Sequence, residues 1–200
     1  MSNNKAIDLL AQGDNQGAVN IFSEVLPALL TLVDDAEANN GALYDCVMRT
    51  SHSSLCDETI FNRGMTMILS EPTCPDTSPF PKVLATVYYN AALAFHRHAL
   101  STSQTRNLAV AKTLYLGAVD SLECCSLQTH DHAMVLLLAA YSNLSQVQRE
   151  LYDLNEYASS CNTVSQLMSV VELGILDDDE AKFFVFGTIE HGFDLAAGAA

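Results

Sequence analysis

The sequence is poor in positive charge, and this scarcity limits what the protein can bind. Only 9 of its 200 residues are Lys or Arg, against 24 Asp and Glu, which gives a formal net charge of −15 at pH 7. Because a chain with this charge repels polyanions, we expect it to bind neither nucleic acid nor a membrane surface. Charged residues make up only 16% of the chain and hydrophobic residues 49%, which is enough apolar material for a core and excludes intrinsic disorder.

Long hydrophobic runs and targeting signals are also missing. The longest uncharged stretches, such as 133–148, contain Ser, Asn and Gln and fall short of the roughly eighteen apolar residues that a spanning helix needs. The N-terminal sequence MSNNKAIDLLAQGDN resembles neither a secretory signal nor an Arg-rich transit peptide. The sequence therefore predicts an intracellular protein of the cytoplasm, in which the six cysteines stay reduced.

Motifs of catalysis are absent, and metal motifs are weak. No G-x-S-x-G elbow, phosphate-binding Gly-rich loop, H-E-x-x-H pair or paired-cysteine redox motif occurs, so we expect no enzyme activity and no cofactor. Two groups of Cys and His lack the C-x-x-C spacing that is typical of zinc sites. They are Cys124, Cys125, His130 and His132, and separately Cys46, His52, Cys56 and Cys74. A metal- or thiol-dependent protein that uses the Cys124 to His132 region is the alternative function, with Asp131 able to orient a histidine base.

The sequence is rich in helical periodicity, with apolar residues at i, i+3, i+4 and i+7. A short first helix is expected over about 5–12, capped by Ser2 or Asn3 and ended by Gly13, and a second helix, kinked at Pro27, begins at Asp14 or Asn15. Two further helix pairs are expected over about 82–99 and 105–124, and over about 131–151 and 154–173. Short connectors make each pair an antiparallel hairpin, so the sequence predicts a mainly α, all-α type of fold.

Two regions depart from this periodicity. Residues 40–81 contain short β-branched and aromatic runs between Ser and Pro clusters, which indicates an insertion that is either a small β-hairpin or irregular. The tail at about 177–200 begins with DDDE, which favours an N-cap and a short helix to about 186 over a calcium site. The alternative for FFVFGTI is a strand that pairs with TIFNRGMTM. We expect one domain over residues 1–200.

Three segments carry an internal repeat: AQGDNQGAVNIFSEVL, YYNAALAF with VAKTLYLGAV, and SNLSQVQRELYDLNEYASSC. Tyr88 and Asn90 recur 53 residues later as Tyr141 and Asn143. The chain thus resembles the tetratricopeptide-repeat (TPR) family, and its insertion and tail are similar to TPR-like proteins of large microalgal families. This resemblance implies stacked antiparallel helix hairpins with a concave binding face.

In the register of that family, the first helix of each hairpin lines the concave face. Asn side chains there can hold the backbone of an extended peptide, and Arg97 and Arg149 can bind a carboxylate. The competing interpretation is that Asn90 and Asn143 join neighbouring helices and that the arginines are solvated. The favoured hypothesis is a non-catalytic protein–protein interaction module, binding a peptide or protein partner with an acidic segment or free C-terminus. Its expected ligand-binding residues are Tyr89, Asn90, Leu93, His96, Arg97, Asn143, Gln146 and Arg149.

Overall fold

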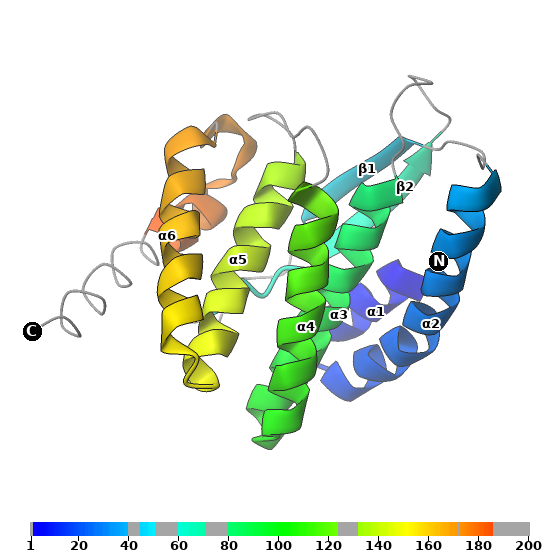
Figure 1. The fold of residues 1–200 in the computed structure, drawn as a ribbon, viewed down its shortest axis with the longest axis horizontal. Helices are drawn as coiled ribbons and strands as arrows, with labels where there is room; N and C mark the ends of the chain where they lie inside the picture. The colour runs from blue at the N-terminus through cyan, green and yellow to red at the C-terminus, as the bar shows by residue number, and fades with distance from the viewer. Residues whose placement is uncertain are drawn as a thin grey trace, which may run out of the picture.

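Three helix hairpins stack in chain order, from α1–α2 at one end to α5–α6 at the other (Figure 1). The computed structural model describes residues 2–39, 45–50, 60–70, 80–123, 132–171 and 173–185. The fold is mainly helical, as the periodicity predicts. Its elements are α1 (Ser2–Ala11), α2 (Asn15–Asn39), β1 (Asp45–Thr50), β2 (Met65–Ser70), α3 (Phe80–Thr102), α4 (Thr105–Glu123), α5 (His132–Glu150), α6 (Leu154–Val170), a 3-10 turn η1 (Leu173–Ile175) and a last helical segment over 178–185.

The same connector closes all three hairpins. In each connector one residue has a positive φ: Gly13 (83°) in the first, Ser103 (54°) in the second and Tyr152 (61°) in the third. The N–H of the next residue then donates to the carbonyl five positions earlier, over 2.9 Å, 3.2 Å and 2.8 Å respectively. This is the hydrogen bond of a Schellman helix end, which lets the chain turn back within three residues. Gly13 was expected in this role, whereas Ser and Tyr rarely adopt a positive φ and give no such signal.

Packing follows the predicted apolar stripes. Ala18 and Phe22 of α2 and Tyr115 of α4 are fully buried, and α5 is buried over 133–140 and 142–148. Among the described residues, consecutive helices contact one another, and the first helices of the hairpins also make contacts from α1 to α3 and from α3 to α5. The first helices therefore form one continuous inner layer.

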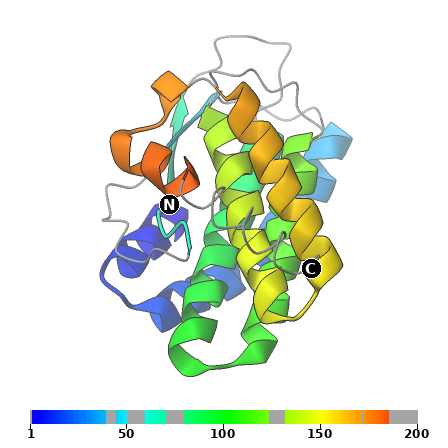
Figure 2. The same cartoon turned by 90° about the vertical axis from the view of Figure 1, so that its left-hand side faces the viewer.

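The insertion contains a two-stranded antiparallel sheet, the β-hairpin alternative that the sequence left open. β1 pairs with β2 from Asp45 opposite Ser70 to Thr50 opposite Met65. β2 contacts α1 and α3, so the sheet lies against the inner layer. Figure 2 shows the strands on the same side of the helices as the last described segment, residues 173–185, drawn in orange.

The DDDE run does begin a helix. The Asp177 Oδ1 atom accepts the N–H groups of Asp179 (3.0 Å) and Glu180 (2.8 Å), and the Glu180 carboxylate accepts the Asp177 N–H (3.1 Å). This reciprocal pair is a capping box. Phe183 and Phe184 lie in the helical segment, so the strand alternative is wrong for the described part of FFVFGTI.

Several predicted boundaries need correction. α1 begins at Ser2, so Asn3 lies inside the helix, where its side chain is buried and contacts β2 instead of capping. α6 ends at Val170 rather than near 173, because the backbone of Val171 is extended. Among the described helices, none is long and apolar enough to cross a membrane.

Candidate functional site

An extended part of the insertion lies across the inner layer of helices. We call residues 60–67 the inserted segment. Its first contact is with α5, where the Phe61 N–H donates to Asn143 Oδ1 over 2.7 Å and Asn143 Nδ2 donates back to the Phe61 carbonyl over 2.9 Å. One carboxamide thus satisfies both backbone groups of one residue, in the way that a neighbouring strand would.

Asn90 of α3 makes the same pair of hydrogen bonds with Met65. Its Oδ1 accepts the Met65 N–H over 2.7 Å, and its Nδ2 lies 2.8 Å from the Met65 carbonyl and 2.9 Å from Asn3 Oδ1. Asn4 of α1 holds Met67 likewise, over 3.2 Å and 3.0 Å. Three asparagines from three first helices therefore clamp one extended backbone.

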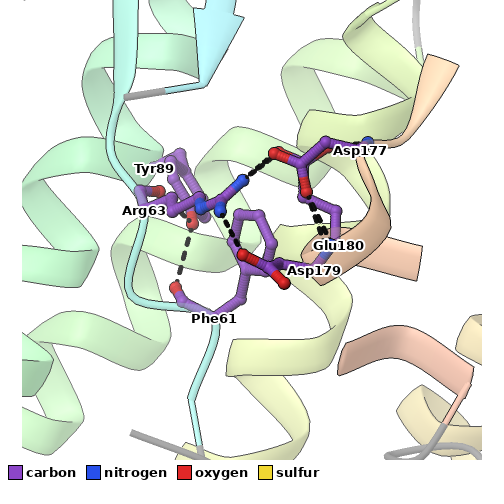
Figure 3. A network of polar contacts seen from close by, with 6 residues as sticks. All are labelled: Phe61, Arg63, Tyr89, Asp177, Asp179 and Glu180. Carbon is purple, nitrogen blue, oxygen red and sulfur yellow. Dashed lines mark hydrogen bonds and ion pairs between the residues drawn. The ribbon is translucent and has the colours of Figure 1, made fainter. Parts of the chain in front are cut away.

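Every second residue of the inserted segment turns its carbonyl to the helices. Between Phe61 and Met65, the Tyr89 hydroxyl lies 3.3 Å from the Phe61 carbonyl and 3.0 Å from the Arg63 carbonyl (Figure 3). The hydrogen-bonded carbonyls recur every two residues, as they do along one edge of a β-strand. The helices therefore bind this segment much as a neighbouring strand in a sheet would. Complete burial raises the pKa of the Tyr89 phenol well above its ordinary value, and the nearby acids Tyr115 and Glu180 raise it further. The phenol is protonated at neutral pH, as an unperturbed tyrosine also is, so its hydroxyl can donate a hydrogen bond to these carbonyls.

A buried arginine fixes the middle of the inserted segment. Arg63 is only 5% exposed, and its guanidinium pairs with three carboxylates that we call the acidic cluster: Asp177, Asp179 and Glu180. Nη1 contacts Asp177 Oδ2 and lies 3.3 Å from Glu180 Oε1, while Nη2 lies 3.5 Å from Asp179 Oδ2 (Figure 3). Burial raises the pKa of the Asp177 carboxyl, but the Glu180 N–H and the Arg63 guanidinium outweigh it, so the pKa is lowered.

Two more residues of the inserted segment, Phe61 and Gly64, pack closely against the neighbouring helices. The Phe61 ring stacks on Phe184 at 4.9 Å between centroids and meets the edge of Phe183 at 5.5 Å. At Gly64, an added Cβ would lie 3.1 Å from two carbons of the Ile7 side chain, which is tighter than ordinary contact. The inserted segment is thus held between the inner helices and the 178–185 helix.

The structure separates the eight predicted ligand-binding residues into two groups. Tyr89, Asn90 and Asn143 contact the inserted segment, and Leu93, His96 and Gln146 are buried with them. Arg97 is half-buried and Arg149 is exposed. In this conformation a partner cannot reach the buried six, because the protein's own chain covers them. Their binding of an external ligand stays a prediction.

Sequence reasoning missed the other half of this site. Asn3, Asn4, Arg63 and the acidic cluster were not expected to meet, although the cluster was recognised as a helix start. One signal was available: the clamp residues Asn4, Asn90 and Asn143 all lie on first helices of hairpins. Asn90 also bonds to Asn3, so the interpretation that these residues join neighbouring helices holds in part.

The alternative metal or thiol site falls mostly outside the described residues. Residues 124–131 are not described, and His132 is an exposed residue at the start of α5. Cys161 of α6 is buried. Within the described ranges, no group of three or more His, Cys, Asp or Glu could hold a metal ion. The alternative use of Cys124 to His132 stays a prediction.

Comparison with known proteins found no matching family model, no matching curated protein and no matching solved structure. Functional inference therefore depends on the geometry of the site itself.

Proposed function

We propose that this protein is a non-catalytic protein-interaction module that binds an extended peptide, or an extended segment of a protein, along the inner layer formed by α1, α3 and α5. One observation carries the proposal: Asn143, Asn90 and Asn4 each bracket the N–H and C=O of one residue in the same extended chain. The resemblance of the repeat segments to the TPR family supports the same function, because stacked helix hairpins in that family bind partners on the concave face.

The chemistry of the clamp suits a peptide rather than a small metabolite. A carboxamide offers one acceptor and two donors, which match the two hydrogen-bonding groups that every peptide unit carries. Main-chain hydrogen bonds of this kind supply affinity in strand-addition complexes, while side-chain pockets supply specificity. Because the inserted segment occupies the clamp, binding requires that this segment leave first.

The charge at the clamp bears on the kind of partner. The sequence alone favoured an acidic partner guided by Arg97 and Arg149. Among the described residues, three carboxylates contact the inserted segment and surround its arginine. This arrangement favours a basic peptide over an acidic one.

A peptide-library selection tests the proposal. A random phage-displayed library would be selected against the full chain carrying Arg63→Ala, a change intended to loosen the inserted segment. Enriched peptides should bind at least about tenfold more weakly when Asn143→Ala is added, because a backbone clamp is lost. The matched control is Asn107→Ala, a partly exposed asparagine of α4 whose side chain donates to the Gln104 side chain, and it should leave binding unchanged. Failure to enrich any peptide, or equal binding to both double variants, would contradict the proposed function.

A further inference from the structure

We call the helix surfaces that hold the inserted segment, from α1, α3, α5 and the 178–185 helix, the groove. Three of its features recognise particular residues of the inserted segment, independently of the backbone clamps. The Phe61 ring packs against the rings of Phe183 and Phe184. Arg63 is enclosed by the acidic cluster. Gly64 lies where a side chain would press on Ile7. Together these features select a four-residue pattern at positions 61–64: an aromatic residue, any residue, an arginine and a glycine.

We propose that the inserted segment is a built-in pseudo-ligand, and that the external partner of this groove is an extended peptide with that same pattern. The inference rests on the proposed function and adds the sequence class of the partner. When no external peptide is bound, the inserted segment occupies the hydrogen-bonding groups of the three clamp asparagines. A partner that carries the pattern takes its place.

Each recognising contact can be made by another chain. The clamps and the Tyr89 hydroxyl bind backbone atoms, which every peptide has. The capping box that positions Asp177 and Glu180 lies within the 176–185 region and uses no atom of the inserted segment. An arginine from another chain could therefore pair with the same carboxylates.

Arginine is the residue that this cluster suits best. Its guanidinium presents five N–H donors in a planar fork, so it can reach three carboxylates at once, whereas the ammonium of lysine is a compact point charge. Glu180 is buried, with a side chain only 3% exposed, and a buried carboxylate needs a cationic partner. The net charge of −15 also attracts a basic peptide over distance.

The inserted segment has one advantage over any external peptide, since it is covalently attached. Attachment gives an effective concentration that is commonly in the millimolar range, so a free peptide of equal sequence competes poorly. A peptide should therefore bind only where the inserted segment is weakened. Arg63→Ala is the variant for this purpose, because it removes the contact with the acidic cluster and leaves the clamps intact.

The experiment uses a fluorescein-labelled peptide with the sequence of residues 60–67, IFNRGMTM, and the full chain. Fluorescence anisotropy should show saturable one-to-one binding to the Arg63→Ala chain, and binding to the unchanged chain that is at least about tenfold weaker. A second peptide, in which alanine replaces the arginine, should bind the Arg63→Ala chain at least about tenfold more weakly than IFNRGMTM does. A third peptide, in which lysine replaces the arginine, should bind with an affinity between those of the other two peptides. A scrambled peptide of the same composition should not bind.

The outcomes separate this inference from the proposed function. If the peptides with Arg and with Ala bind the variant equally, the groove binds backbones and the arginine rule is wrong. If library peptides bind but IFNRGMTM does not, the pseudo-ligand is wrong and the proposed function stands. If no peptide of either kind binds a folded variant, both are wrong.

A second measurement covers the case in which Arg63→Ala does not fold. In the unchanged chain, hydrogen exchange of the Phe61 and Met65 amides reports whether the inserted segment opens by itself. Exchange that is at least about tenfold faster than that of the buried α5 amides would support a displaceable segment. Exchange at the same rate as those amides would overturn the inference, because the inserted segment would then open only when the whole protein unfolds.

Discussion

Replacing Asn90 by alanine tests the clamp most directly. Asn90 is fully buried and bonds to the Met65 N–H, the Met65 carbonyl and Asn3 Oδ1. In the Asn90→Ala variant the Met65 carbonyl keeps a bond from Asn3 Nδ2 at 3.3 Å, but the Met65 N–H and Asn3 Oδ1 lose their partner. A buried polar group left without a partner costs about 1–3 kcal/mol, so the two groups lower the free energy of unfolding by about 2–6 kcal/mol.

Urea unfolding followed by circular dichroism measures this loss. The matched control is Asn107→Ala, which removes the same carboxamide from a partly exposed position on α4 and should stay within about 0.5 kcal/mol of the unchanged protein. Asn143→Ala should also be destabilising, because it removes the partner of the buried Phe61 N–H. If Asn90→Ala unfolds within about 0.5 kcal/mol of the unchanged protein, the asparagines do not hold the inserted segment and the clamp is wrong.

Three further predictions concern pH, close packing and backbone strain. Because the folded pKa of Asp177 is lowered, its stabilisation is complete above the ordinary carboxyl pKa of about 3.9 and is lost as the pH falls through the folded value. Urea midpoints should therefore fall more between pH 5 and pH 3 in the unchanged protein than in Asp177→Asn, and an equal fall would refute this. Gly64→Ala should lower the free energy of unfolding by about 1 kcal/mol, because the added Cβ presses on Ile7, and it should have no effect in an Ile7→Ala background. A double-mutant cycle that shows no coupling between the two positions would contradict this close approach. Tyr152→Gly should raise the stability by about 0.5 kcal/mol in thermal unfolding, because Tyr152 has φ 61° and is 85% exposed; an unchanged melting temperature would show that no strain is stored there.

The helices could be predicted because their signals are local. Starts at Thr105 and Leu154 agree with the sequence, since the apolar stripe and the short connector both lie within a few residues of the boundary. The Schellman ends at Ser103 and Tyr152 could not be anticipated, because neither residue type indicates a positive φ. Helix ends were predicted less well, as α6 shows by stopping at Val170, because no local feature indicated the extended backbone of Val171.

The site was predictable only in its chemistry. The recurrence of Asn90 as Asn143 indicated carboxamides that could hold an extended backbone, but no local feature showed that the backbone belongs to this chain. Asn143 and Phe61 are 82 positions apart, and Arg63 and Asp177 are 114 apart. Pairing across such separations is decided by how the hairpins stack and where the insertion returns, and single-sequence periodicity reports neither.

The scarcity of positive charge supports a different conclusion once the fold is known. In an acidic chain, a rare arginine was expected to belong to the receptor face and to attract an acidic partner. A groove that converges several carboxylates has the opposite need, because carboxylates brought together repel one another and are stabilised only by a cation placed between them. Arg63 meets that need from the inserted segment, so the cation belongs to the ligand-like chain and the anions to the groove. Under the proposed function, the buried Arg63 therefore predicts a basic partner, whereas the half-buried Arg97 and the exposed Arg149 had predicted an acidic one.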